Sequence, residues 1–232
     1  MFTLSFLITC LSKKIKIFMK RIMVVGCCGS GKSTLARKLH VITNLKLFHL
    51  DQYYWKPNWK PTEEKEWNTV VKELTSNESW IIDGNYKETI DLRIAKADTI
   101  IMLNLSTLTC LVRIIKRIII NWGKVRSDMP LGCIEKFDLE FLKYVYQFQK
   151  TQGVALKEKL QNLANEKKII ILESDKEIKY FEGRLDQIKL TNEKNNAQIL
   201  SAEKGVKMPQ VGKIGNKVRK DINKANDNEF EL

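Results

Sequence analysis

Cysteine is scarce in this chain and is not arranged for a disulfide framework. The five cysteines among 232 residues include no Cys-x-x-Cys pair, and they are too few to staple a chain of this length. We interpret them as reduced thiols of a cytoplasmic protein. Cys27 and Cys28 are adjacent, and we interpret them as filler side chains rather than as a redox switch.

Acidic residues are missing from Thr99 to Ser127. Over the whole chain 40 Lys and Arg stand against 27 Asp and Glu, a formal net charge of +13 at pH 7. The acid-free stretch holds Arg113, Lys116, Arg117, Lys124 and Arg126. Basic surface attracts phosphate-rich partners, so this balance fits a nucleotide or a nucleic acid without choosing between them.

No apolar run is long enough to predict a transmembrane segment. The first eighteen residues are apolar up to Leu11 and then carry three lysines, which is the wrong order for a secretory signal. Because Met19 stands directly before the first expected strand, we interpret residues 1–18 as an N-terminal extension of the gene model. A short membrane-surface anchor is the alternative.

A glycine-rich sequence with the spacing of a phosphate-binding loop runs from Gly26 to Thr34. It reads Gly-Cys-Cys-Gly-Ser-Gly-Lys-Ser-Thr, between an apolar run at 22–25 and a helical pattern, which is the context that this motif requires. Its backbone N–H groups are expected to surround a phosphate. We expect Lys32 to reach the β- and γ-phosphates of ATP and Ser33 to coordinate Mg²⁺. The expected nucleotide-binding residues are Gly26, Gly29, Ser30, Gly31, Lys32, Ser33 and Thr34.

Short apolar runs alternate with amphipathic stretches up to about Phe181, as is typical of parallel strands joined by helices. The sequence therefore predicts one doubly wound α/β domain over residues 19–182. Expected strands lie at 21–26, 46–50, 79–83, 98–104 and 168–173, and expected helices lie near 32–43, 63–76, 88–96, 106–120, 138–165 and 175–182. Ser106 and Asp138 are the expected N-caps of two of these helices.

The composition changes after about residue 183. Asn, Lys, Gln and Gly dominate from there to residue 232, and the apolar residues become isolated. Such a segment cannot bury enough apolar surface to offset the entropy of ordering. We expect residues 183–232 to form a disordered tail.

Two carboxylates stand at the ends of predicted strands. Asp51 follows the strand at 46–50, and Asp83 ends the strand at 79–83. Ligands of open α/β folds bind at this edge of the sheet. Asp51 is a candidate base for a substrate hydroxyl, and Asp83 is a Walker-B-like ligand for Mg²⁺, with Gly84 leaving room for the substrate. The alternatives are a helix cap at Asp51 and an ordinary Asp-Gly turn.

Arginines follow one face of the helix expected at 106–120. Arg113 and Arg117 lie four residues apart, and Arg126 is close in sequence. We expect them to clamp phosphates and to stabilise the transferring phosphoryl group. Residues 121–136 are expected to form a lid that excludes water. A solvated basic face or a nucleic-acid patch is the alternative.

An aromatic cluster follows Asp51 directly. Its members are Tyr53, Tyr54, Trp55, Trp59 and Trp67. Such rings can stack on a nucleobase, and they can equally form the small core of a substrate-binding arm. Tyr54 is a candidate substrate contact on the first interpretation.

Several motifs together resemble adenylate-kinase-like bacterial proteins known as topology modulation proteins. They are the phosphate-binding loop, His-Leu-Asp-x-x-Tyr-Trp-Lys-Pro-x-Trp at 49–59, Trp-Ile-Ile-Asp-Gly-Asn-Tyr at 80–86 and Asp-Met-x-x-Gly-Cys at 128–133. The resemblance covers residues 19–181. It implies a P-loop NTPase fold with a three-layer α/β/α arrangement, a five-stranded parallel sheet of order 2-3-1-4-5, and an ATP site.

The chain departs from adenylate kinase where that enzyme binds AMP. Adenylate kinase follows its Asp-Gly with Phe-Pro-Arg, whereas this chain has Asn85-Tyr86-Lys87, and Tyr54 stands where adenylate kinase has a further arginine. We therefore expect a kinase for a small hydroxyl- or phosphate-bearing, nucleoside-like acceptor rather than for AMP.

Two other functions remain open at this stage. The family name suggests a regulator associated with DNA topology, but the sequence has no helix-turn-helix, zinc-finger or other reader motif. The second is an ATP-dependent switch without kinase activity. The sequence does not determine the oligomeric state.

Overall fold

The computed structural model describes residues 19–203, and their side chains up to residue 190. The expected N-terminal extension and the tail beyond Glu203 lie outside the described residues. The chain divides into two units, residues 1–188 and 189–232. The sheet and all site residues belong to the first unit, and the described part of the second is the end of one helix.

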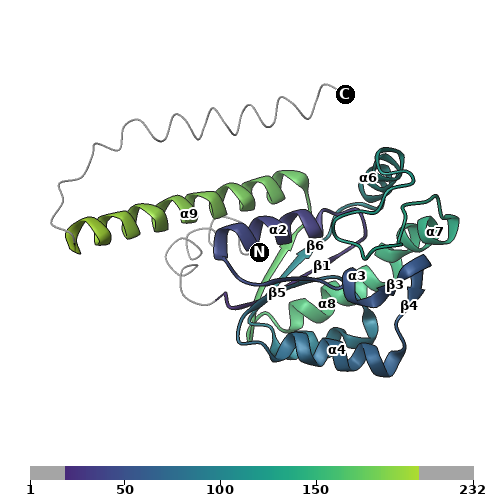
Figure 1. Cartoon of the computed structure of the whole chain (residues 1–232), viewed down its shortest axis with the longest axis horizontal. Helices are drawn as coiled ribbons and strands as arrows, with labels where there is room; N and C mark the ends of the chain where they lie inside the picture. Colours follow the sequence, from purple (N-terminus) through teal and green to yellow (C-terminus); the bar gives the residue numbers. More distant parts are fainter. Residues whose placement is uncertain (1–18, 204–232) are drawn as a thin grey trace. The chain divides into compact units, whose positions relative to one another are not determined.

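A five-stranded parallel sheet forms the centre of the first unit (Figure 1). Its strands are β1 (Arg21–Gly26), β2 (Leu47–His49), β5 (Trp80–Asp83), β6 (Thr99–Leu103) and β7 (Lys168–Leu172). They lie in the order β2-β5-β1-β6-β7, all with parallel neighbours. Counted along the chain, this is the order 2-3-1-4-5, and the expected fold class is confirmed.

Helices connect the strands on both sides of the sheet. The helices are α2 (Lys32–Thr43), α3 (Asp51–Tyr54), α4 (Glu64–Ser76), α5 (Ile90–Lys96), α6 (Thr107–Ile120), α7 (Leu139–Phe148), α8 (Val154–Asn162) and α9 (Asp175–Glu203). Short 3₁₀ turns lie at Pro57–Trp59 (η1) and Lys87–Thr89 (η2). A small hairpin of β3 (Trp55–Lys56) and β4 (Lys60–Pro61) belongs to the arm after α3.

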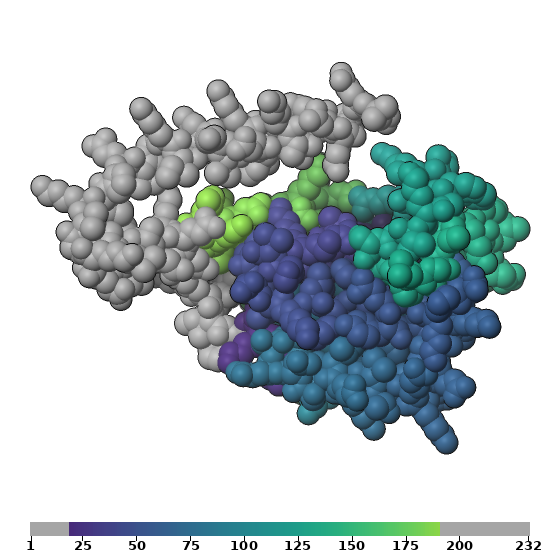
Figure 2. Space-filling view, in the orientation of Figure 1, coloured from purple at the N-terminus to yellow at the C-terminus, as the bar shows by residue number. Residues whose placement is uncertain are grey.

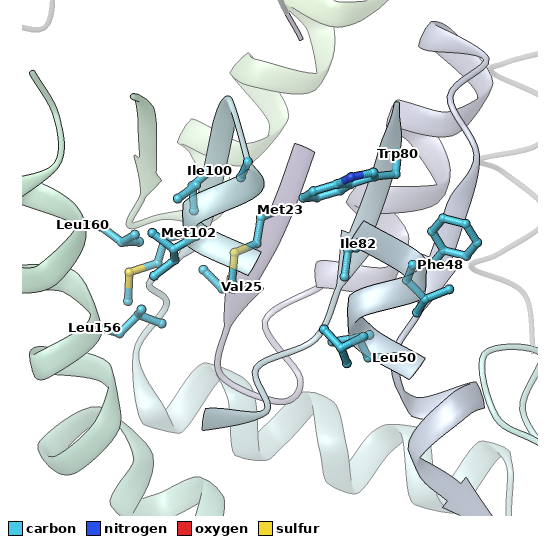
Figure 3. Packing of buried hydrophobic residues seen from close by; sticks show 14 of the residues in the cluster. Met23, Val25, Phe48, Leu50, Trp80, Ile82, Ile100, Met102, Leu156 and Leu160 are labelled. Carbon is cyan, nitrogen blue, oxygen red and sulfur yellow. The ribbon is translucent and has the colours of Figure 1, made fainter. Parts of the chain in front are cut away.

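The two faces of the sheet are buried by different helices because side chains alternate along a strand. Met23 and Val25 of β1 pack in a cluster with residues of α4 and α8. Figure 3 shows this cluster, with Leu156 and Leu160 of α8 reaching toward the strand residues. Ile22 and Val24 of β1 pack instead with residues of α2 and α9. The sheet is therefore buried on both sides, as the almost continuous apolar strands require.

The predicted strand boundaries agree with the structure to within two residues. Both expected N-caps are confirmed, because the Ser106 side chain accepts a hydrogen bond from Thr109 N and the Asp138 side chain accepts one from Phe141 N. The single helix expected at 138–165 is wrong. Residues 149–153 form a π-helical turn (η3) between α7 and α8, where the Gln149 side chain donates to Leu105 O at 2.6 Å.

The expectation of disorder directly after residue 183 also differs from the structure, in which α9 continues to Glu203. Phe181 and Leu185, four residues apart, are both buried in the cluster that contains β1 and α2. Lys38 of α2 forms ion pairs with Glu182 and Asp186. These contacts stabilise a polar helix that has little apolar periodicity of its own.

Gly26 ends β1 in a place that no other residue can occupy without strain. Its φ is +136°, and a Cβ atom there would lie 2.2 Å from Leu103 O of the neighbouring strand. We expect Gly26→Ala to lower the free energy of unfolding by roughly 3 kcal/mol or more. Gly123→Ala is the matched control, because Gly123 has φ +71° but no atom within 4 Å of an added Cβ.

Urea unfolding of the two variants measures this difference. The control is expected to lose only about 1 kcal/mol, the cost of a left-handed backbone. Equal losses in the two variants would show that the close approach of β6 is not what restricts this position.

Candidate functional site

The glycine-rich loop lies between β1, the central strand of the sheet, and α2. The Lys32 ammonium donates a hydrogen bond to Cys27 O at 3.0 Å, and Ser30 N donates to the same carbonyl at 3.2 Å. Ser33 and Thr34 lie in the first turn of α2. The loop is thus closed on itself, and its lysine bends back over it at the N-terminus of a helix, where anions are favoured.

Asn85 ties this loop to the end of β5. Its side-chain oxygen accepts from Gly26 N at 3.0 Å, and its side-chain nitrogen donates to Gly26 O at 2.8 Å. The pair satisfies both backbone groups of Gly26 with one amide. We did not anticipate this role, because nothing in the sequence near Asn85 indicates a partner 59 residues away.

Arg93 fixes the backbone that carries Asn85. It is fully buried, and its guanidinium donates to Gly84 O at 2.7 Å and to Tyr86 O at 2.9 Å, with a further contact to Asn85 O. Burial lowers the pKa of Arg93 to about 9, so the group is still charged at neutral pH. Arg93 therefore determines the path of three consecutive residues beside the glycine-rich loop.

Asp51 begins α3, and the hydroxyl of Tyr86 donates to its Oδ1 at 2.5 Å. Burial raises the pKa of the Asp51 carboxyl, and the nearby charge of Asp83 acts in the same direction. The hydrogen bond from Tyr86 and the charge of Lys32 oppose this change. The result is an oriented carboxylate that accepts a proton more readily than an exposed Asp does.

Asp83 lies on the strand next to the glycine-rich loop, paired in register with Val24 of β1. It is buried, with 5% of its surface exposed. His49 Nδ1 lies 2.7 Å from Asp83 Oδ2. Nothing in the sequence indicates that His49 contacts the candidate magnesium ligand.

The predicted arginines do not stand free on a basic face. Arg113 Nη2 pairs with Asp175 at 2.5 Å, and its Nη1 donates to Ser30 O of the glycine-rich loop at 3.4 Å. Arg117, one turn further along α6, contacts Glu135. The structure thus places Arg113 against the loop backbone and Arg117 toward the predicted lid.

Glu135 joins two arginines from different segments. It is 4% exposed, and its Oε1 accepts from Arg117 Nε at 3.0 Å. Its Oε2 lies 2.9 Å from Arg126 Nε, while Arg126 Nη1 donates to Asp128 Oδ2 at 3.2 Å. We did not anticipate Glu135, although a carboxylate shortly after an acid-free basic stretch is a usable signal.

Cys28, in the middle of the glycine-rich loop, is influenced by four charged groups. Burial is the main cause that raises the pKa of this thiol, and the charge of Asp51 adds to it. Lys32, Arg117 and Arg126 all oppose the change. The charges of a lysine, two arginines and a carboxylate therefore all influence this thiol.

The segment predicted as a lid, residues 121–136, lies on the arm that follows α3. Gln52 Nε2 donates to Ser127 O at 2.9 Å, and Trp59 Nε1 donates to Ile134 O at 2.9 Å. The backbone of Asn58 donates to Gly132 O at 3.1 Å. These bonds join the two segments along the side of the site that holds Asp51.

The aromatic cluster forms packing contacts rather than an open stacking surface. Tyr54 lies 5.1 Å from Trp67 and 4.5 Å from Tyr86, measured between ring centroids. Trp67 is 1% exposed, and Trp55 stacks edge-on against Tyr54 and Trp59. Tyr54, Trp55, Trp59 and Trp67 therefore form the small core of the arm, whereas Tyr53 is 38% exposed and contacts Phe48.

In the described part of the chain there is no cluster of three or more His, Cys, Asp or Glu side chains that could hold a metal ion. None of its helices is long and apolar enough to cross a membrane.

The sheet order, together with a glycine-rich loop between the central strand and a helix, defines an α/β P-loop NTPase fold.

No protein-family model matches the sequence, and a comparison with curated proteins finds no match. Similar solved structures include shikimate kinase from Bacteroides thetaiotaomicron, which is 16% identical over 76% of this chain and 99% of that one, with a TM-score of 0.44. Shikimate kinase from Acinetobacter baumannii, in complex with shikimate, is 14% identical over 79% and 97%, with a TM-score of 0.46. A gluconokinase from Sinorhizobium meliloti is 13% identical over 78% and 98%, with a TM-score of 0.42.

The raised pKa of Asp51 predicts that this carboxylate destabilises the folded protein. A folded-state pKa above the unfolded value means that the folded state binds the proton more tightly, so stability is lost as pH rises through the folded pKa. Any negative charge that Asp51 carries in the folded state therefore costs stability. We expect Asp51→Asn to raise the free energy of unfolding at pH 7, with the gain disappearing below about pH 4.

Urea unfolding at several pH values measures this effect, with Asp91→Asn as a control because Asp91 is exposed on α5. A loss of stability in Asp51→Asn at pH 7 would contradict the raised pKa.

Removal of Glu135 leaves two arginines without their shared carboxylate. Breaking a buried ion pair from one side typically costs about 3–5 kcal/mol, and we expect Glu135→Ala to lower the free energy of unfolding by an amount in this range. Glu78→Ala is the control, since the Glu78 side chain is 87% exposed in its pair with Lys20 and such pairs contribute little. Denaturant unfolding measures the loss in each variant. A loss in Glu135→Ala no greater than that in Glu78→Ala would mean that Glu135 does not stabilise the fold through the two arginines.

Proposed function

We propose that this protein is a kinase that transfers the γ-phosphoryl group of ATP to a small, nucleoside- or nucleotide-like acceptor. The observation that carries this proposal is a glycine-rich loop with Lys32 bent over it, tied by Asn85 to the strand end where Tyr86 holds Asp51. Phosphoryl transfer needs positive charge around the transferring group and a positioned base for the acceptor. The proposal assigns both to this one place.

The nucleotide would bind with its phosphates on the backbone N–H groups of the loop from Gly26 to Thr34. Lys32, which bends over the loop, would exchange its bond to Cys27 O for the β- and γ-phosphates. Bound Mg²⁺ would neutralise charge on these phosphates. Ser33 and Asp83 are suited to hold it, because a hydroxyl and a carboxylate are hard oxygen donors and His49 contacts only one carboxylate oxygen of Asp83.

Asp51 would act as the base for the acceptor. As the acceptor oxygen forms its bond to the γ-phosphorus, the bond from that phosphorus to the oxygen of the leaving ADP breaks, and the acceptor proton moves to Asp51. Tyr86 orients the carboxylate through its hydrogen bond. The raised pKa of Asp51 favours the uptake of that proton.

The arginines would stabilise the charge that spreads over the transferring group. Arg117 and Arg126 are held in position by Glu135, so their side chains are ordered before a nucleotide arrives. Arg113, which contacts Ser30 O, would support the loop from outside. The lid at 121–136 would exclude water that competes with the acceptor.

The acceptor would lie between Asp51 and the arm, next to Gly84 and Tyr54. Asn85 is bound to Gly26 and Tyr86 to Asp51, so neither is available to replace the arginine with which adenylate kinases grip AMP. This supports an acceptor that is recognised without that arginine.

The DNA-associated alternative has less support. Three of the five basic residues in the acid-free stretch, Arg113, Arg117 and Arg126, are paired with carboxylates. Paired charges contribute little to the counterion release that dominates DNA binding.

Transfer of labelled phosphate from ATP to a panel of nucleosides, nucleotides and other small metabolites, with Mg²⁺, tests the proposal. We expect transfer to one acceptor class, and a loss of at least about a hundredfold in Lys32→Ala. Lys38→Ala is the matched control on the same helix, because Lys38 pairs with α9 instead, and it is expected to keep its activity. ATP binding without transfer to any acceptor would favour a nucleotide switch.

A further inference from the structure

Helix α6 carries its polar and apolar residues on unexpected faces. Its arginines face inward, as their pairs with Asp175 and Glu135 require. The outer face is instead apolar. Leu108, Val112, Ile115 and Ile119 are 72%, 57%, 45% and 70% exposed. Their spacings of four, three and four residues place them along one side of the helix, and we call these four residues the α6 stripe.

The exposed apolar surface continues beyond the α6 stripe. Trp122 is 61% exposed just after the helix, and Leu131 in the lid segment is 85% exposed. Of the seventeen large hydrophobic residues exposed in the described part of the chain, twelve lie between Leu108 and Tyr146. In Figure 2 the teal atoms of this region form one edge of the first unit. Apolar surface that is gathered in this way marks an interaction site.

The exposed charges on α6 and in the turn that follows it have one sign. Lys116 and Lys124 are exposed, and no acidic residue occurs from Thr99 to Ser127. The arginines of the same stretch are turned toward the site and paired there. The outer surface around the stripe is therefore apolar with exposed lysines, a composition typical of helices that lie on anionic membranes.

We propose that the α6 stripe binds the surface of an anionic lipid bilayer. The helix lies in the plane of the membrane, with the α6 stripe at the boundary between headgroups and acyl chains. Lys116 and Lys124 contact the anionic headgroups, and the Trp122 ring lies at the headgroup level. This role is independent of the proposed kinase function, because the stripe is on the face of α6 opposite the arginines.

A second copy of the chain fits this surface less well. A specific dimer interface uses about 20–30 residues on each side with close shape complementarity, more than the twelve exposed hydrophobic residues between Leu108 and Tyr146 supply. Pairing two such faces would also bring the lysines of both copies together without a carboxylate from this stretch of either. Binding to a bilayer requires no close shape complementarity, and its negative headgroups are the only charges that the exposed lysines need.

Sedimentation of the full chain with phospholipid vesicles tests the proposal. We expect binding to vesicles of phosphatidylcholine mixed with phosphatidylglycerol, weaker binding at high salt, and little binding to phosphatidylcholine alone. The variant Val112→Ser/Ile115→Ser/Ile119→Ser is expected to lose at least about tenfold in vesicle affinity. Lys116→Glu is expected to lose affinity for the anionic vesicles.

The matched control is Val41→Ser/Val154→Ser/Tyr180→Ser, which removes three equally exposed apolar side chains outside this region. It should bind vesicles as the unchanged chain does. Thermal unfolding of both triple variants verifies that each is folded, which exposed positions should permit.

Three results with vesicles would overturn the proposal. They are no binding to anionic vesicles, equal binding by both triple variants, and equal binding to neutral and anionic vesicles. Equal binding by the triple variants would assign the membrane contact to another part of the chain, such as residues 1–18. Analytical ultracentrifugation without vesicles tests the other possible occupant, a second copy of the chain. A dimer that the α6 triple variant dissociates and the control variant does not would assign this face to a second copy and overturn the proposal.

Discussion

The buried guanidinium of Arg93 is the interaction on which the rest of the site depends. A fully buried cation is costly unless its donors are satisfied. Here Nη1 and Nη2 donate to the backbone carbonyls of Gly84, Asn85 and Tyr86 rather than to a carboxylate, while Nε has no partner among the described residues. The same three residues carry the contacts of the site. Asn85 holds the glycine-rich loop at Gly26, and Tyr86 orients Asp51. One side chain thereby links the end of β5, the phosphate-binding loop and the candidate base.

The charges of the site are arranged before any ligand binds. Glu135 holds two arginines, and Tyr86 and the neighbouring cations hold a carboxylate whose burial disfavours its charge. Burial disfavours the charge of the Asp51 carboxylate, yet Tyr86 orients this group. Oriented charge in a site with little water is what stabilises a phosphoryl group in transfer. The stability lost at Asp51 is of the kind expected where a protein keeps a reactive group.

Much of the fold could be predicted from local patterns. The glycine-rich loop identifies the central strand and the first helix, and the alternation of apolar and amphipathic stretches predicts the other strands of the sheet. Ser106 and Asp138 act as caps because capping depends on a residue's immediate neighbours. Asp51 and Asp83 could be placed at the edge of the sheet because parallel strands all end there.

The features that could not be predicted depend on contacts between distant segments. Asn85 and Arg93 resemble ordinary surface residues until the loop at 84–86 is folded, and Glu135 acquires its role only when the lid segment meets α6. Helix α9 extends past the predicted end because Phe181 and Leu185 are buried in the core. The polar composition of this segment does not indicate that burial. The break between α7 and α8 depends in the same way on Leu105, which accepts the Gln149 side chain.

A crystal structure with Mg²⁺, a non-hydrolysable ATP analogue and the acceptor would test the central claim most directly. The account predicts the γ-phosphate over Cys28, within hydrogen-bond distance of Lys32 and of at least one of Arg117 and Arg126, with the acceptor hydroxyl at Asp51. A triphosphate bound away from the glycine-rich loop, or an acceptor oxygen out of reach of Asp51, would contradict it.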